Sequence, residues 1–363
     1  MKRTPGLVTS AARMPELERL FREGTGGWLG GDCAFSTPLD RERILWLFGD
    51  SLVSPDPEAT TRAGARIVAN SVAIQTGQKV QFWWGTASEG PSAFFATPTL
   101  PGRCWPLSAI RLGDRLAVLA VRVVTVDPDQ VTGFRIVGHE LYWVKNPDAA
   151  PEEWQIELQR LPWSEKTGTF GSWLLAHDEY VYVYGFRRHF RSWFKEVRTV
   201  VARVPIARPL AIADPNLWEY LDGERGTWSK QEDALRPMLE QGATEFSVSF
   251  LPGLGKFVMV AGHPRCHNAV QLRVADTPYG PFSEAQTVLP CPEVKQSRHY
   301  FCYAAKAHPE LATAPTELVV SYAVNSRRLE DCFRDHDIYF PRFLRISVAS
   351  QGRAADGQSA HPA

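Results

Sequence analysis

Two carboxylic acids, Asp32 and Glu245, stand directly before apolar runs in widely separated parts of the sequence. An ionised acid at the mouth of a buried strand costs desolvation free energy unless it is paired or takes part in chemistry. A third acid, Asp50, ends the second apolar run after Asp32, and antiparallel pairing of the two runs would return it to the same end. Such a set suits glycosidic cleavage, in which one acid protonates the leaving oxygen and another carboxylate attacks or activates water.

The third acid has a role in this chemistry, because like-charge coupling can keep the proton on the correct carboxyl group. The alternative is structural: Asp32 and Asp50 would cap turns, and Glu245 would pair with an arginine such as Arg187 or Arg265. We favour the chemical interpretation, because the three acids take related places in a repeated pattern of the sequence.

The repeated pattern is a hairpin of two apolar runs joined by a polar turn. Its β-branched and aromatic residues, bounded by Gly, Asp and Pro, are typical of strands. The five hairpins start near residues 32, 106, 171, 245 and 303, a period of roughly 60–75 residues against about 40–50 for a minimal propeller blade. First strands are predicted at 33–39, 107–112, 173–176, 246–251 and 303–308, and second strands at 44–48, 116–124, 180–184, 256–260 and 317–322.

The rest of the chain is also predicted to be mainly β. Further strands are expected at 71–75, 93–96, 140–144, 199–204, 270–275 and 343–348. Helical periodicity is confined to 14–22 and 232–239, and Pro237 weakens the second. Five repeats of this length favour an all-β, five-bladed β-propeller in a single domain. We expect an N-terminal extension over 1–26, the propeller over 27–349 and a disordered tail over 350–363.

In a propeller the innermost strands run along the axis, so polar residues at their starts converge on one pocket. Trp105 and Tyr303 would form sugar-binding walls there, because aromatic rings offer flat stacking surfaces. His308 could bond a sugar hydroxyl, hold a structural cation or pack in the core, and Asn70 could orient Asp50, bind a hydroxyl or cap a turn. The residues predicted to bind substrate are Asn70, Trp105, Ser172, Tyr303, Lys306 and His308.

Composition excludes several classes of partner and chemistry. Lys plus Arg and Asp plus Glu both number 40, so no net field attracts nucleic acid, a membrane surface or another polyanion. Six cysteines without a CxxC pair predict neither a zinc site nor a disulfide framework; Cys33, Cys104 and Cys302 would be small buried hydrophobes. No cofactor is expected. No segment resembles a signal peptide or a membrane span, so we expect a cytoplasmic monomer, or a secreted one if a leader was removed.

Several motifs resemble a known family. Residues 30–39, GGDCAFSTPL, followed by ILWLFGDS at 44–51, are similar to the opening blade of the bacterial proteins called domain of unknown function 4185, some of which are endo-D-arabinanases. Other matches are Asn70-Ser71, Trp105-Pro106, EFSV at 245–248, YAAKAHPE at 303–310 and SYAVN at 321–325. The turn ADTPYGPF at 275–282 is shared with five-bladed arabinanases, xylosidases and fructosidases. The likeness covers residues 27 to 348.

The resemblance implies a five-bladed propeller that hydrolyses a furanose-containing polysaccharide. It also implies that Asp32, opening the first blade, is the base or nucleophile and that Glu245 is the acid, while Asp50 matches the Gly-Asp-Ser/Thr motif of the family. Cys33 stands where glycine is expected. The alternatives are a non-catalytic carbohydrate-binding or scaffold propeller, and a cation-dependent hydrolase or lyase that uses His308.

Overall fold

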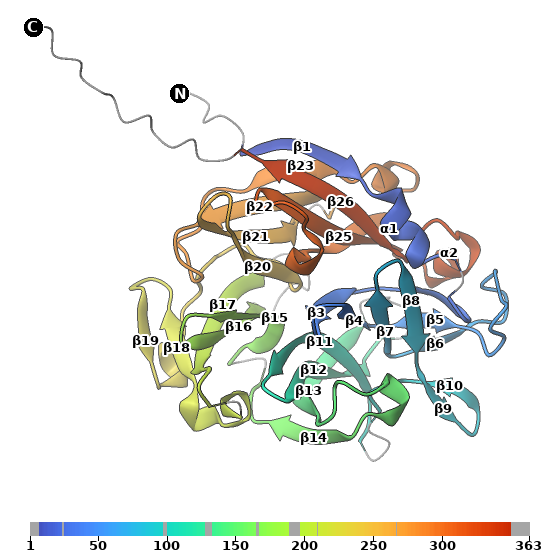
Figure 1. Ribbon diagram of the computed structural model, residues 1–363, viewed down its shortest axis with the longest axis horizontal. Helices are drawn as coiled ribbons and strands as arrows, with labels where there is room; N and C mark the ends of the chain where they lie inside the picture. The colour runs from blue at the N-terminus through green and yellow to red at the C-terminus, as the bar shows by residue number, and fades with distance from the viewer. Residues whose placement is uncertain are drawn as a thin grey trace, which may run out of the picture.

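The computed structural model describes residues 7–23, 25–96, 100–127, 133–164, 167–188, 197–208, 210–265 and 267–349, and this part of the chain is mostly β, as predicted. Five antiparallel sheets of four or five strands follow one another around a common centre (Figure 1). The first strands of neighbouring sheets contact each other in the order β3, β11, β15, β20, β24. Side-chain hydrogen bonds connect β24 with the region of β3, so the fifth sheet lies beside the first.

The strands of these five sheets, from the inside outward, have the following bounds. The first sheet holds β3 (Phe35–Pro38), β4 (Arg43–Phe48), β7 (Ser71–Thr76) and β8 (Lys79–Trp83), and the second β11 (Arg103–Leu112), β12 (Arg115–Thr125), β13 (Phe134–Val144) and β14 (Ile156–Leu161). The third holds β15 (Thr169–His177), β16 (Tyr180–Arg188), β17 (Val197–Pro205), β18 (Glu219–Asp222) and β19 (Thr227–Ser229). The fourth holds β20 (Phe246–Leu251), β21 (Lys256–Gly262), β22 (Ala269–Ala275) and β23 (Gln286–Pro290), and the fifth β24 (Tyr300–Ala307), β25 (Glu317–Ser326), β26 (Pro341–Val348) and β1 (Val8–Arg13).

Smaller elements lie beside the first sheet. A three-stranded sheet contains β2 (Trp28–Gly31), β5 (Ser51–Val53) and β6 (Arg66–Val68), and a separate hairpin contains β9 (Gly85–Ala87) and β10 (Gly90–Ser92). The α-helices of the described residues are α1 (Pro15–Leu20) and α2 (Leu329–Arg334). Neither is long and apolar enough to cross a membrane.

The hydrophobic core lies between the sheets. Middle strands such as β12 are buried on both faces and therefore read as continuous apolar runs without alternation. Leu45 and Leu47 of β4 belong to the same buried cluster as Val118 of β12 and Tyr142 of β13, which joins the first sheet to the second. This face-to-face packing explains why the second strand of each hairpin was easy to recognise in the sequence.

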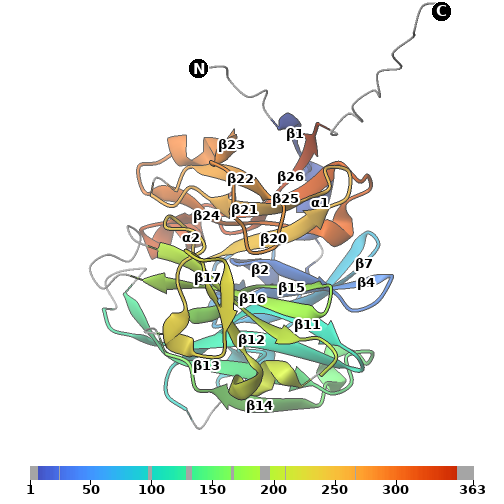
Figure 2. The ribbon, with the colours of Figure 1, turned by 90° about the vertical axis from the view of Figure 1, so that its left-hand side faces the viewer.

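The structure corrects three expectations about the elements. Residues 93–96 form no strand, and β8 takes the outer place in the first sheet. The predicted helix at 232–239 is reduced to the 3₁₀ turn Glu232–Ala234, consistent with the proline at position 237. Residues 8–13, which we had assigned to an N-terminal extension, form β1 and pair with β26 as the outer strand of the fifth sheet (Figure 2).

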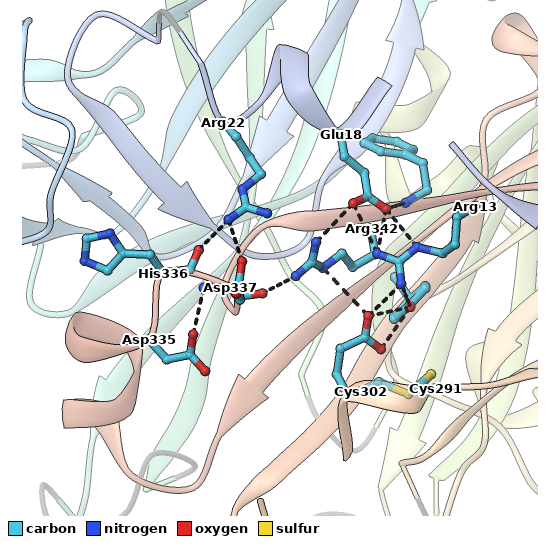
Figure 3. Close-up of polar contacts among 12 residues, drawn as sticks. Arg13, Glu18, Arg22, Cys291, Cys302, Asp335, His336, Asp337 and Arg342 are labelled. Atoms are coloured by element: carbon cyan, nitrogen blue, oxygen red, sulfur yellow. Dashed lines mark hydrogen bonds and ion pairs between the residues drawn. A yellow bond between two sulfur atoms is a disulfide. The ribbon is translucent and has the colours of Figure 1, made fainter. Parts of the chain in front are cut away.

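A buried ionic cluster attaches β1 and α1 to this sheet. We call it the closure network: Arg13, Glu18, Glu293, Tyr322 and Arg342. Figure 3 shows Glu18 of α1 between Arg13 of β1 and Arg342 of β26, whose guanidinium nitrogens lie 2.9 and 3.0 Å from its carboxylate. Glu293 accepts a hydrogen bond from Arg13 at 2.8 Å and another from the Tyr322 hydroxyl at 3.1 Å. Ends of the chain far apart in sequence are therefore joined by charged pairs.

A disulfide between Cys291 and Cys302 lies beside the closure network (Figure 3). The expectation that Cys302 is an unpaired hydrophobe was therefore wrong. Its partner is eleven residues away, before β24 begins, and this spacing carries no pairing signal without the path of the chain. Among the described cysteines, Cys33, Cys104 and Cys332 are free.

Candidate active site

A cavity of about 730 Å³ opens where the first strands of the sheets begin. Its wall includes one residue near the start of each inner strand, either just before the strand or in its first four residues: Asp32, Trp105, Thr169, Glu245 and Tyr303. Asp50, which follows β4, also lines the cavity. The three carboxylic acids singled out in the sequence therefore share one solvent-reachable space, and we call them the acidic group.

Asp32 lies in the link between β2 and β3. One carboxylate oxygen accepts a hydrogen bond from the Tyr303 hydroxyl at 2.8 Å, and the other accepts one from the Cys33 thiol at 3.4 Å. Burial and the negative charges of Asp50 and Glu245 raise the pKa of Asp32 to about 7, although both hydrogen bonds act in the opposite direction. Asp32 therefore exchanges a proton near neutral pH.

Asp50 is held mainly by neutral donors. Its Oδ1 accepts a hydrogen bond from the Trp105 indole at 2.8 Å, and its backbone oxygen accepts one from the Tyr339 hydroxyl at 2.9 Å. Arg103 Nη1 lies 3.6 Å from Oδ2, a loose ion pair at the cavity wall. Burial raises the pKa of Asp50, and Arg103 and Trp105 oppose this shift.

Glu245 stands just before β20 and has a cation beside it. Lys306 Nζ lies 3.3 Å from Glu245 Oε2, and the lysine side chain is fully buried. The same ammonium donates to the backbone oxygens of Cys33 and Ala304. Lys306 therefore stabilises the negative charge of Glu245 from behind the cavity wall and ties together the starts of β3, β20 and β24.

Backbone strain concentrates around Asp32. Four non-glycine residues near it have left-handed φ values: Cys33 (68°), Ala34 (50°), Ala304 (56°) and Tyr339 (66°). A left-handed backbone conformation costs free energy for residues other than glycine. It persists where the surrounding structure imposes it, often at functional sites. The value at Cys33 explains why glycine is the expected residue at that position.

Interruptions of strand pairing occur at equivalent points of three inner strands. The register shifts between Pro106 and Ala109 in β11, between Phe170 and Trp173 in β15, and between Tyr303 and Lys306 in β24. Such bulges re-aim side chains next to active sites. The bulge in β24 lies between Tyr303, which lines the cavity, and Lys306, which does not.

Of the six predicted substrate-binding residues, Trp105 and Tyr303 line the cavity, and the other four do not. Asn70 is fully buried and holds the backbone of Phe95 and Cys104 through its amide. Ser172 donates to the Thr244 backbone oxygen at 2.8 Å. Both residues position neighbouring segments, because a buried amide or hydroxyl bonds to whatever backbone group is nearest.

His308 also lies outside the cavity. Its Nδ1 and Nε2 are 2.6 and 2.7 Å from the hydroxyls of Ser36 and Ser321, and its ring packs 4.8 Å from that of Trp46. Burial and the charge of Lys306 lower the pKa of His308 well below its ordinary value, so the ring is neutral. Among the described residues, no group of three His, Cys, Asp or Glu side chains is placed to hold a metal ion. Both ring nitrogens are engaged, so this geometry does not support a cation on His308.

Sequence reasoning missed several residues of the cavity wall. Asn325 lies near the end of β25 and donates to the Tyr303 hydroxyl at 3.2 Å, and Tyr339 lies between α2 and β26. Phe134 begins β13 and packs edge-on against Trp105 at 4.3 Å. Asn325 ends the SYAVN motif, which could have identified it, whereas no local signal marks Tyr339 or Phe134.

A basic cluster, RRHFR at 187–191, begins at the end of β16. Arg188 lines the cavity, whereas Arg187 donates to the backbone oxygens of Thr167 and Leu235 and does not pair with Glu245. His189, Phe190 and Arg191 lie outside the described residues.

Comparisons with solved structures show that the fold is shared. A Bacteroides ovatus ATCC 8483 protein described as a "putative hydrolase" aligns with a TM-score of 0.72 at 20% identity, over 95% of this chain and 93% of that one. The GH43_1 enzyme from Xanthomonas citri, complexed with xylose, aligns with a TM-score of 0.50 at 16% identity, over 98% and 93%. A protein of unknown function from Dyadobacter fermentans DSM 18053 aligns with a TM-score of 0.52 at 10% identity, over 95% and 100%.

Sequence comparisons place the chain more directly. No curated protein sequence matches it. One family, described as "Domain of unknown function (DUF5005)", matches residues 16–349, which include every strand described above except β1. The likeness to domain of unknown function 4185 and to endo-D-arabinanases is not confirmed. By the extent of this match, the chain belongs to the DUF5005 family.

Proposed function

We propose that this protein is a glycoside hydrolase that cleaves a furanose-containing glycan, and that its five sheets are the blades of a propeller around the site. The observation that carries the proposal is the acidic group: three carboxyl groups in one cavity, one of them with a pKa raised to about 7. Acid and base catalysis of glycosidic cleavage requires a carboxyl group that can carry a proton at neutral pH and a second carboxyl group close to it.

The charge environment suggests which acid carries the proton. Glu245 has the Lys306 ammonium at 3.3 Å, whereas Asp32 has neutral donors and two neighbouring acids. We therefore assign Asp32 as the general acid that protonates the leaving oxygen and Glu245 as the carboxylate that attacks or activates water. The charge of Asp50 keeps the proton on Asp32. This assignment reverses the roles implied by the family resemblance.

The aromatic wall supports an oligosaccharide as the ligand. Trp105 and Tyr303 both line the cavity, and their polar atoms are committed to Asp50 and Asp32. Their rings are thus held rigidly, and ordered rings offer stacking surfaces to a sugar at little entropic cost. A related fold in the Xanthomonas citri enzyme complexed with xylose is consistent with a sugar site.

The test compares two variants on two kinds of substrate. Asp32→Asn and Glu245→Gln are assayed for release of reducing ends from arabinan, arabinoxylan and other furanose-containing glycans, and for cleavage of dinitrophenyl furanosides. A variant that lacks the general acid should still cleave the dinitrophenyl furanoside, because dinitrophenolate leaves without being protonated. We expect Asp32→Asn to lose about 10³-fold on the glycan and to retain the aryl substrate, while Glu245→Gln loses both.

The opposite pattern would restore the roles implied by the resemblance. Unchanged glycan turnover in Asp32→Asn would reject the site. Binding of oligosaccharides without release of reducing ends by the wild-type protein would instead favour the non-catalytic, carbohydrate-binding alternative.

A further inference from the structure

Three arginines on the cavity wall share an arrangement that the hydrolytic mechanism does not use. Arg103, Arg188 and Arg327 come from the second, third and fifth sheets. Each guanidinium lies over an aromatic ring that also lines the cavity: Arg103 over Trp105 at 5.6 Å, Arg188 over Phe186 at 4.7 Å, and Arg327 over Phe301 at 5.9 Å. We call these the three arginine–aromatic pairs.

Two of the three arginines, Arg103 and Arg327, lie nearer to solvent than the acidic group, whereas Arg188 is partly buried. The Arg103 side chain is 42% exposed and Arg327 is exposed, whereas the side chains of Asp50 and Glu245 are 21% and 13% exposed. The cavity is therefore acidic at depth and basic toward its mouth. Overall neutrality of the chain conceals this separation, because net charge says nothing about where charges lie.

Nearby carboxylates leave positive charge available on Arg103 and Arg327 at the mouth. Arg103 reaches Asp50 through Nη1 at 3.6 Å and donates to the Thr125 hydroxyl through Nη2 at 3.5 Å. These two long contacts use only part of the five N–H donors of its guanidinium. Arg328 is paired with Glu330, so that pair contributes no net charge. Within the described part of the chain, no carboxylate forms an ion pair with Arg327. Burial, and after it the positive charge of Arg327, lowers the pKa of His267 to about 4. His267 therefore adds no positive charge at neutral pH.

Stacking on a ring prepares a guanidinium for recognition. The aromatic ring fixes the plane of the guanidinium group. The N–H donors along the edge of the guanidinium remain able to form two parallel hydrogen bonds with a carboxylate or a sulfate. Neutral sugars do not require this charge, whereas an acidic sugar would place its anion at the mouth and its glycosidic oxygen toward the acidic group.

From these observations we infer that the cavity selects an anionic glycan, one whose sugars carry a carboxylate or a sulfate, and that the arginine–aromatic pairs form its anion subsite. This inference rests on the proposed function for the orientation of the chain in the cavity. The recognition itself concerns binding and can be measured without turnover.

The experiment measures binding of matched charged and uncharged oligosaccharides by isothermal titration calorimetry. The Asp32→Asn protein is used so that no probe is consumed. One pair is trigalacturonate and its methyl ester, which differ in charge alone at nearly equal size. The other is a sulfated galactan tetrasaccharide and its desulfated form. These two arms distinguish a carboxylate from a sulfate as the anion.

We expect the charged member of at least one pair to bind tenfold or more tightly than its neutral counterpart at low salt, with the difference shrinking as salt is raised. Adding Arg327→Gln should weaken the charged probe about tenfold and leave the neutral one within twofold. The matched control is Arg225→Gln, which removes the same charge from an 81% exposed side chain outside the cavity wall and should change neither.

Equal binding of charged and neutral members in both pairs would overturn the inference, as would equal effects of Arg327→Gln and Arg225→Gln. Thermal unfolding of each variant checks that it is folded. The outcomes separate the two proposals: wild-type hydrolysis of neutral glycans without charge preference retains the hydrolase and rejects the anion subsite. Selective binding of charged probes without any turnover by the wild-type protein retains the anion subsite and rejects the hydrolase.

Discussion

Two groups of buried carboxylates in this molecule are held in opposite ways. In the closure network, Glu18 lies between the guanidinium groups of Arg13 and Arg342 and also accepts a bond from the backbone nitrogen of Phe343. In the acidic group, Asp32 has a phenol and a thiol as donors and two carboxylates as neighbours. Both arrangements satisfy hydrogen bonds, but the carboxylate of Glu18 has two cations directly against it, whereas the cations of the acidic group lie beside Glu245 and Asp50 and not beside Asp32.

The difference separates structure from chemistry. A carboxylate between arginines fixes the elements around it, because removing either partner leaves an uncompensated buried charge. A carboxylate with neutral donors and like charges is free to take up and release a proton near pH 7. The same residue type thus joins the chain ends in one place and is available for acid–base chemistry in the other.

Replacing the proton-carrying acid should produce the largest change. We expect Asp32→Asn to reduce glycan turnover by about 10³-fold and at the same time to stabilise the fold above pH 7. The folded-state pKa of about 7 lies above the ordinary 3.8, so the wild-type protein loses stability as pH rises from about 4 to 7. Asparagine removes that loss.

Activity assays and denaturant unfolding at pH 4.5 and pH 8 measure both effects. A destabilised Asp32→Asn protein at pH 8 would show that Asp32 is structural, like the acids of the closure network.

The same neutralisation in the closure network should have the opposite sign. Glu18→Gln leaves Arg13 and Arg342 without their shared carboxylate, and we expect a loss of about 3 kcal/mol in the free energy of unfolding. Turnover well below the melting temperature should be unchanged. Denaturant unfolding measures the loss, and Glu16→Gln is the control, since Glu16 is exposed on the same helix. Equal stability of the two variants would contradict the contrast.

The pH profile tests the assignment of Asp32 as acid. Above the pKa of about 7 the catalytic proton is lost, so kcat/KM for an unactivated glycan should fall about tenfold per pH unit. With the dinitrophenyl substrate this alkaline limb should disappear. A kcat/KM that instead rises through pH 7 on both substrates would identify Asp32 as the base.

Relieving strain beside Asp32 should have the smallest effect. Cys33 has a φ of 68°, which glycine adopts without the clash of a Cβ atom. We expect Cys33→Gly to raise the free energy of unfolding by up to about 1 kcal/mol, while Cys33→Ala, which also removes the thiol, should not. Thermal unfolding of the two variants compares them, and an equal change in both would attribute the effect to the thiol.

Much of the fold could be predicted because its signals are local. Apolar runs, polar turns and glycines mark the hairpins, and the segment 14–22 contains α1. The errors arose where pairing is distant: β1 joins β26 across almost the whole chain, and Cys291 meets Cys302 through a turn before β24. No local pattern encodes such contacts, since they depend on where the last sheet ends.

The sequence by itself determined the β-rich repeats and the presence of acids at their starts, because both follow from short-range alternation of apolar and polar residues. Only the tertiary structure decided which polar side chains face the cavity. Tyr303 and Lys306 belong to one strand, yet the first lines the cavity and the second does not. The bulge between them changes the register with β25, and a bulge of this kind cannot be recognised from the alternation of residue types alone.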